Sequence, residues 1–239
     1  MKLEVAQKIV KQTAVDYDQM STKFDQTRSF AWTDFEYFKP YIKPNASILD
    51  FGCGNGRLVD WLKPFRPKSY LGADISEKLI NIAKAQYQNM PWIKFRLIDS
   101  VETQHVASLR PNASDCIFCL AVLHHIPSKE LKQQLVSQFY QWLKPGGYLF
   151  LTNWNLKQKK FRPYRLKYKL KWLSGQSELD WQDLYYPFKN NQGQILAQRY
   201  LHAFRKSELV KACQKIGFQI RLNKQSENNL IIIAQKEVK

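Results

Sequence analysis

The sequence predicts an α/β fold: a doubly wound, mostly parallel sheet of seven strands with helices on both faces. Two observations predict it. Short apolar runs alternate with helical patterns along the chain, as in folds built from strand–helix–strand units. The runs are apolar throughout, which is typical of parallel strands buried on both faces. The expected strands are residues 47–51, 70–75, 93–98, 116–123, 148–152, 218–223 and 230–235.

The predicted helices have recognisable beginnings and ends. Ser76 is a typical N-cap residue for the helix that follows the second strand. Gly217 ends the last helical pattern, and Pro145-Gly146-Gly147 predicts a tight turn into the fifth strand. The expected helices in the core and at its end are residues 57–63, 76–87, 129–143 and 207–216, and the first 45 residues also read as helical.

Charge is the unusual feature of the composition. The 239 residues include 37 Lys and Arg against 20 Asp and Glu, a formal net charge of +17. Residues 151–239 hold 18 basic and 6 acidic side chains, so this third of the chain carries most of the excess. A basic lobe on a nearly neutral body indicates a polyanionic partner, either nucleic acid or an anionic membrane surface.

Nothing in the sequence indicates a membrane span or secretion. Uninterrupted apolar runs such as residues 230–234 are far shorter than a bilayer requires. The first eight residues lack the apolar core of a signal peptide, and the four cysteines are irregularly spaced. We therefore expect a cytoplasmic protein without a membrane partner.

The strongest motif is Asp50-Phe51-Gly52-Cys53-Gly54-Asn55-Gly56, which follows the first predicted strand and opens a helix. Its glycines allow a sharp turn and a close approach of the backbone to a ligand. Asp74 and Asp99 end the next two strands, at the edge where open α/β sheets bind ligands. A carboxylate at Asp50 is unsuited to a phosphate and favours a ligand with positive charge, such as an ammonium or a sulfonium.

These elements, in this order, resemble the class I S-adenosylmethionine-dependent methyltransferases, which have a Rossmann-like sheet. The resemblance runs from about Ile48 to Thr152 and includes Leu120–His125 after the fourth strand and the turn at residues 143–147. It implies S-adenosyl-L-methionine as the cofactor. By this resemblance Asp50 and the loop hold the methionine part, Asp74 binds the ribose, and later residues surround the adenine or line the site. The implied cofactor contacts are Asp50, Gly52, Cys53, Gly54, Gly56, Asp74, Ile75, Ile98, Asp99, Ser100, Leu120 and Ala121.

The flanking segments narrow the resemblance. Phe24-Asp25-Gln26-Thr27-Arg28 with Trp32, and the later Arg199-Tyr200-Leu201-His202-Ala203-Phe204, are similar to the eukaryotic tRNA methyltransferases that esterify the 5-carboxymethyl group of the wobble uridine. The chain departs from that family at Asn228-Asn229-Leu230, where an Asp-Asn-Trp segment is expected. The resemblance implies the tRNA anticodon loop as partner, and a small zinc-binding activator protein as a possible second partner.

Two other functions remain open at this level. One is a small-molecule methyltransferase on the same fold, for example for a lipid quinone. The other is a cofactor-binding RNA-interaction protein without turnover. The expected organisation comprises an N-terminal cap (1–45), a cofactor-binding core (46–154), a basic insertion or lid (155–200), and a C-terminal helix and hairpin completing the sheet (201–239).

A carboxylate acceptor sets simple demands on the site. It is already ionised, so its methylation needs no general base, and positioning supplies most of the catalysis. Arg28 and Arg199 are candidate bidentate cations, and the alternative for Arg28 is a surface salt bridge. The side chains expected to line or complete the pocket are Tyr17, Tyr200, His125 and His202. We expect no metal site. The adjacent His124 and His125 point different ways, and Cys116-x-x-Cys119 lies within a predicted strand and has no second half.

Residues 157–172 intersperse eight cations with aromatic side chains. Cations neutralise phosphates and aromatic rings stack on unpaired bases, so this composition favours a single-stranded RNA surface. A basic amphipathic helix on a membrane and a plain solvated loop are the alternatives. The predicted nucleic-acid contacts are Lys159, Lys160, Arg162, Arg165, Lys167 and Lys169.

Overall fold

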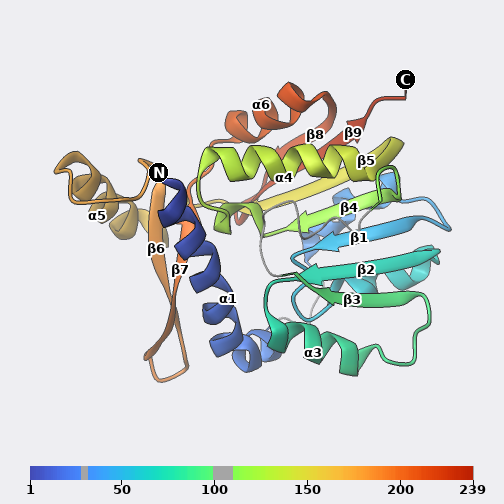
Figure 1. Ribbon diagram of the computed structural model, residues 1–239, viewed down its shortest axis with the longest axis horizontal. Helices are drawn as coiled ribbons and strands as arrows, with labels where there is room; N and C mark the ends of the chain where they lie inside the picture. The colour runs from blue at the N-terminus through green and yellow to red at the C-terminus, as the bar shows by residue number, and fades with distance from the viewer. Residues whose placement is uncertain (28–31, 99–109, 239) are drawn as a thin grey trace.

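The computed structural model describes residues 1–27, 32–98 and 110–238. Seven strands form one sheet in the order β3-β2-β1-β4-β5-β9-β8 (Figure 1). Strand β9 runs antiparallel to both of its neighbours, and the other pairs are parallel, which confirms the predicted fold class. The strands are β1 Ser47–Phe51, β2 Ser69–Asp74, β3 Ile93–Leu97, β4 Ser114–Leu120, β5 Leu143–Trp154, β8 Phe218–Gln225 and β9 Asn229–Lys236.

Apolar side chains bury both faces of this sheet. One core cluster gathers around Leu135 and Phe139 of α4, and it also includes buried side chains of α6. The opposite cluster gathers around Phe38 and Phe150, and it includes buried side chains of α2. Ser76 accepts the backbone N–H of Leu79 at 3.2 Å, the predicted N-cap of α3. These helices are α2 Leu58–Leu62, α3 Glu77–Gln86, α4 Lys129–Trp142 and α6 Lys206–Ile216.

Several element boundaries differ from those predicted, and two of these differences change the course of the chain. The expected turn at residues 145–147 is part of β5, which begins at Leu143 because that residue already pairs with Ser114 across a β-bulge. The fourth strand stops at Leu120, because Ala121 has a φ of 58° and turns the chain into a short 3-10 segment. This turn carries the following residues over the end of the sheet.

The N-terminal cap consists of α1 Leu3–Gln26, followed by the 3-10 segments Thr33–Tyr37 and Lys39–Tyr41. Three polar contacts fix the C-terminal half of α1 over the ends of β1 and β2. Asp18 accepts the Ser76 hydroxyl at 2.6 Å and the Lys78 N–H at 3.1 Å. Asn55 donates to Asp25 at 2.7 Å. Helix α1 therefore lies against the glycine loop and the N-terminus of α3 (Figure 1).

The insertion contains an antiparallel hairpin that the sequence pattern did not predict. Strands β6 Asp183–Lys189 and β7 Ile195–His202 form a separate two-stranded sheet that packs beside α1. Asn190 closes the turn, since its side-chain oxygen accepts the N–H groups of Gln192 at 3.0 Å and Gln194 at 2.9 Å. The basic segment precedes the hairpin and forms a 3-10 turn, Lys159–Phe161, and α5, Arg162–Leu173.

Among the helices of the described residues, none combines the length and the hydropathy needed to cross a membrane.

Candidate functional site

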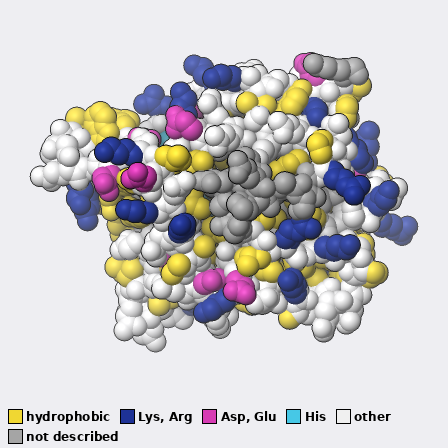
Figure 2. Space-filling model, in the orientation of Figure 1, with side chains coloured by type: hydrophobic (Ala, Val, Ile, Leu, Met, Phe, Trp, Pro, Cys, Tyr) yellow, Lys and Arg dark blue, Asp and Glu magenta, His cyan; other side chains and the backbone are white. Residues whose placement is uncertain are grey.

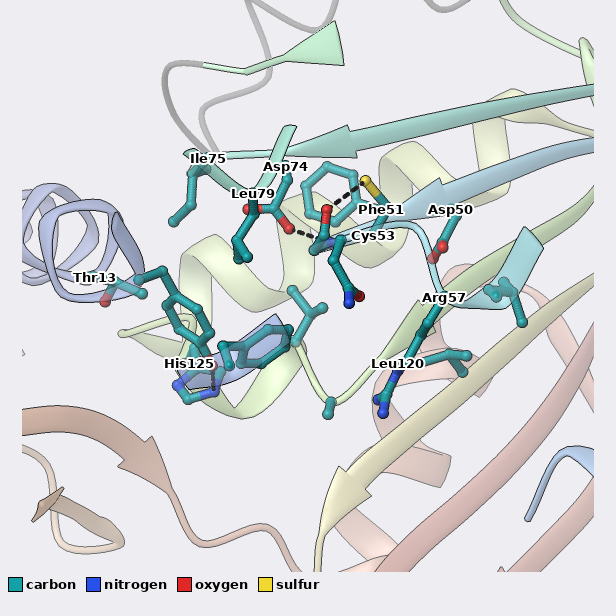
Figure 3. A pocket seen from close by; sticks show the side chains of 18 of the residues that line it. Thr13, Asp50, Phe51, Cys53, Arg57, Asp74, Ile75, Leu79, Leu120 and His125 are labelled. Carbon is teal, nitrogen blue, oxygen red and sulfur yellow. Dashed lines mark hydrogen bonds between the residues drawn. The ribbon is translucent and has the colours of Figure 1, made fainter. Parts of the chain in front are cut away.

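The main pocket lies at the carboxyl ends of β1, β2 and β4, between the glycine loop, α1 and β7 (Figure 3). The structure brings together twelve of the residues that the sequence analysis assigned to cofactor or acceptor. They are Tyr17, Asp50, Gly52, Cys53, Gly54, Asp74, Ile75, Ile98, Leu120, Ala121, His125 and Arg199.

The glycine loop has the shape that a bound ligand requires. Gly52 has a φ of +76°, and a Cβ there would lie 2.1 Å from a methyl of Val122. Gly54 has a φ of +55°, and its Cβ would lie 3.2 Å from the ring of Phe24. Gly56 also has a positive φ but does not line the pocket; it packs against Phe95. The first two glycines thus shape the cavity, whereas the third serves packing behind it.

Asp74 is buried at the end of β2 with both carboxylate oxygens facing backbone donors. It accepts the N–H of Gly54 at 2.8 Å and the N–H of Ser76 at 2.9 Å. Burial raises the pKa of Asp74, and these N–H groups act in the opposite direction. The Ile75 N–H acts in the same direction, and a carboxylate has about four lone-pair sites, so Asp74 can still accept a hydroxyl group of a ligand.

Asp50 is a second buried carboxylate in the pocket. The Tyr70 hydroxyl donates to it at 2.7 Å. Burial raises the pKa of Asp50 to about 7, although the Tyr70 hydrogen bond opposes the shift. A cationic ligand group beside this carboxylate would stabilise its ionised form.

Arg57, which follows the glycine motif directly in the chain, was not among the predicted site residues. Its side chain extends into the pocket from the start of α2, beside Asp50 (Figure 3). The guanidinium carbon lies 4.1 Å from the ring centroid of Trp32, a cation–π contact. A basic residue next to a predicted ligand loop was the available signal.

The described residues fit S-adenosylmethionine. Gly52 and Gly54 line the pocket with backbone, and a Cβ at either position would press against a neighbouring side chain. Asp74 suits the ribose hydroxyls of the cofactor, and Asp50 suits its positively charged methionine end. The pocket also contains a buried amide oxygen, Oδ1 of Asn55, for which the described part of the chain supplies no hydrogen-bond partner. Asp99 and Ser100, expected near the adenine, lie outside the described residues.

Tyr17, in the C-terminal half of α1, forms a hydrogen bond with His125. The Tyr17 hydroxyl lies 2.8 Å from Nε2 of His125, and Nδ1 of His125 lies 2.9 Å from the carbonyl oxygen of Tyr200. Burial lowers the pKa of His125 to about 3, and the charge of Arg199 adds to the effect. The imidazole is therefore neutral: Nδ1–H donates a hydrogen bond to the Tyr200 carbonyl, and Nε2 accepts a hydrogen bond from the Tyr17 hydroxyl.

Arg199 sits at the pocket mouth and is 7% exposed. Its guanidinium carbon lies 4.9 Å from the ring centroid of Trp154 and 5.0 Å from that of Phe188. A second hollow continues outward from it; we call this hollow the vestibule. It shares Trp32, Trp154 and Arg199 with the main pocket. Its other walls include Lys160, Phe161, Tyr186, Phe188 and the β8–β9 turn.

Two predicted acceptor residues point elsewhere. The Tyr200 ring packs with Ile9 and Leu179, so only its carbonyl serves the site, through His125. His202 is held by Asp183 at 2.7 Å and by Glu208. Neither side chain lines the pocket, because neighbouring residues of a strand face opposite sides and Arg199 takes the pocket side. Arg28 lies outside the described residues.

The six predicted nucleic-acid contacts are spread over α5 and the turn before it. Lys160 lines the vestibule, and Arg165 and Lys169 line a different groove on the other side of the segment. Lys159, Arg162 and Lys167 are exposed.

A doubly wound sheet with this strand order, with a glycine loop and two buried carboxylates at its carboxyl edge, defines the class I S-adenosylmethionine-dependent methyltransferases. Comparison with protein families agrees: the model described as "Methyltransferase domain" matches residues 21–223. The chain belongs to this family, and S-adenosylmethionine is its cofactor.

The curated relatives include tRNA-modifying enzymes. A Schizosaccharomyces pombe protein named "tRNA (carboxymethyluridine(34)-5-O)-methyltransferase" is 28% identical over 252 residues, which is 99% of this chain and 100% of that protein. An Arabidopsis thaliana protein of the same name is 28% identical over 170 residues, but these are 69% of this chain and only 39% of the longer relative.

Solved structures share the fold at lower identity. An S-adenosylmethionine-dependent methyltransferase from Methanosarcina mazei has a TM-score of 0.65 at 20% identity, covering 85% of this chain and 98% of that one. A Haloferax volcanii protein solved in complex with the Trm112 methyltransferase activator has a TM-score of 0.64 at 11% identity, covering 95% and 98%.

Proposed function

We propose that this enzyme methylates the carboxylate of a 5-carboxymethyl group on a tRNA wobble uridine, giving a methyl ester. The observation that carries the proposal is Arg199, a nearly buried cation at the junction of the cofactor pocket and an aromatic vestibule. Full-length similarity to a relative named for this reaction supports the same acceptor.

The vestibule suits a nucleobase that carries a carboxylate. The rings of Trp154 and Phe188 flank Arg199 and can stack on a base while excluding water. Its guanidinium can hold both oxygens of a carboxylate in a fork and fix one toward the cofactor pocket. We keep Arg28 as the predicted second cation.

Bound S-adenosylmethionine supplies a methyl group on a positively charged sulfur, and the acceptor oxygen forms a bond to that carbon as the carbon–sulfur bond breaks and sulfur retains the electron pair. No proton moves, so the site needs no base, which is consistent with the neutral, hydrogen-bonded His125. Asp50 would face the cationic end of the cofactor, and Tyr17, hydrogen-bonded to His125, would line the pocket. Positioning of this kind can contribute about 7–11 kcal/mol.

The basic segment would hold the surrounding RNA. Lys160 lies in the vestibule itself, beside Phe161, so the entering nucleotide would pass a cation and an aromatic ring. Lys159, Arg162, Arg165, Lys167 and Lys169 would contact phosphates further along the strand. A small zinc-binding activator protein remains a predicted partner, to be supplied in the assay.

The proposal is tested with tRNA in which carboxylates have been exposed by mild alkali. The purified enzyme, with and without the activator, receives this tRNA and cofactor labelled in its methyl group. We expect label in tRNA, a fall of about 100-fold or more in transfer for Arg199→Gln, and cofactor affinity within about threefold of wild type. The exposed Arg221→Gln on β8 is the matched control and should transfer normally.

Two outcomes would overturn the proposal. One is label that appears only in a small-molecule or lipid fraction, which would favour the small-molecule alternative. The other is unchanged transfer by Arg199→Gln, which would remove the assigned carboxylate contact.

A further inference from the structure

A third hollow of this chain is lined by cations and lies outside the cofactor pocket and the vestibule. We call it the basic groove. It lies between the basic segment, the start of β6 and the N-terminus of α6. Its charged lining comprises Lys157, Arg165, Lys169, Arg205 and Lys206, with the buried Asp183 as the acidic residue.

The five cations are not neutralised by their surroundings. In the described part of the chain no carboxylate forms an ion pair with any of them. Asp183, the acidic residue of the lining, and Glu208 of α6 both contact His202. The groove therefore keeps a local positive charge that can attract an anion.

Two further features extend this charge. Arg205 is the N-cap of α6, so the positive end of the helix dipole lies at this end of the groove, where the Glu208 carboxylate accepts the Arg205 N–H. Lys and Arg side chains also outnumber Asp and Glu over the face seen in Figure 2. The observation that points to a ligand is the clustering of five cations in one groove, and not the general excess of Lys and Arg over the surface.

An exposed indole borders the cations. Trp181 is 36% exposed, its ring lies 4.5 Å from Nζ of Lys169, and it contacts Trp172 at 5.0 Å between ring centroids. Trp172 is itself 44% exposed. Grooves that bind single-stranded nucleic acid combine cations that contact its phosphate backbone with aromatic rings on which its bases stack.

The position of the groove relates it to the vestibule. The two hollows lie on either side of residues 156–165: Lys160 and Phe161 face the vestibule, while Lys157 and Arg165 face the groove. Each is also bordered by the β8–β9 hairpin, through Asn223 in the groove and Asn228 in the vestibule. A strand with one nucleotide in the vestibule can therefore cross the short basic segment into the groove.

We propose that the basic groove is a second RNA-binding site, which holds the phosphodiester backbone of a single-stranded segment flanking the methylated nucleotide. Its contacts are Lys157, Lys169 and Lys206 among the cations, with Trp181 stacking on a base. The inference rests on the proposed function for the identity of the RNA, but binding can be measured without methyl transfer.

The test measures binding of a fluorescent single-stranded RNA of about a dozen nucleotides across a range of salt concentrations. The groove variant combines Lys157→Ala, Lys169→Ala and Lys206→Ala. The control variant removes the same charge from exposed lysines elsewhere, with Lys68→Ala, Lys84→Ala and Lys215→Ala. We expect a wild-type log–log salt slope of roughly −3 to −4, a slope shallower by about 2 in the groove variant, and no change in the control.

Trp181 gives an independent readout. Trp181→Ala should weaken RNA binding by about tenfold without changing the salt slope, and Trp181→Phe should retain most of the affinity, because stacking and not charge is altered. Equal losses of RNA affinity in the groove and control variants would show that net charge alone determines binding, and would overturn the proposal. A groove variant impaired only toward vesicles of anionic phospholipid, and not toward RNA, would also overturn it.

The same variants separate this inference from the proposed function. Methyl transfer to tRNA with an unchanged salt slope in the groove variant would refute the groove and keep the function. A shallower slope in the groove variant, with no transfer by the wild type to tRNA, would keep the groove and refute the function.

Discussion

Replacing Asp50 with Asn should stabilise the cofactor-free protein while weakening cofactor binding. Burial raises the pKa of this carboxyl from 3.8 to about 7, so its ionised form is disfavoured in the folded protein. A group whose folded pKa is raised lowers stability progressively as pH rises from its unfolded pKa through its folded one.

The size of the effect follows from the shift. About three pKa units correspond to about 4 kcal/mol, present in full above about pH 7 and nearly absent at about pH 4. The Asn side chain can still accept the Tyr70 hydroxyl, so the main change is the loss of the charge. The gain in the free energy of unfolding should be smaller than about 4 kcal/mol, because burying the Asn amide also removes it from water.

Urea unfolding of both proteins at several pH values measures this difference. The free energy of unfolding of Asp50→Asn minus that of wild type should grow by about 3–4 kcal/mol between about pH 4 and pH 8. Titration with S-adenosylmethionine at about pH 8 should show at least a tenfold loss of affinity in the variant. A stability difference independent of pH would refute the assigned burial of the charge, and unchanged affinity would refute its role toward a cation.

Three further changes test other parts of the site. Gly52→Ala should cost about 1–3 kcal/mol more than Gly193→Ala, because both positions have positive φ but only the first Cβ meets a neighbour, Val122 at 2.1 Å; chemical unfolding compares them, and equal costs would refute the clash. Tyr17→Phe should lower methyl transfer about fivefold and leave cofactor affinity nearly unchanged; a matching loss of affinity would place its hydroxyl on the cofactor instead. Burial lowers the pKa of His202, but hydrogen bonds to two carboxylates outweigh it and raise the pKa above 6.5, so the stabilisation is full below that value and is lost as pH rises through the raised one. His202→Gln should therefore be more destabilising at about pH 6 than at about pH 9, and a constant difference would contradict this.

The fold and the cofactor loop were predictable because their signals are local. An apolar run followed by glycines at short spacing identifies a buried strand and the turn after it without knowledge of the rest of the chain. Gly52 and Gly54 have the positive φ angles that such a turn requires, and Ser76 caps α3 as its position in the sequence indicates.

The acceptor side was less predictable because it depends on tertiary contacts. The motif around Arg199 identified a segment that reaches the pocket. Strand alternation places Arg199 toward the pocket and Tyr200 away from it, and this depends on the β6–β7 pairing. Arg57 was missed although it lies next to the glycine motif, and its contact with Trp32 forms only in the folded chain. The basic groove combines side chains of three segments, among which only the first is dense in charge.

The most direct test of the central claim is the alkali lability of the methyl group transferred to tRNA. After transfer of labelled methyl from S-adenosylmethionine, brief mild alkali cleaves an ester and leaves methyl groups on nitrogen, carbon or ribose oxygen in place. The account predicts that the label leaves the tRNA as methanol. Label that stays in the tRNA would contradict a carboxylate acceptor and the role given to Arg199.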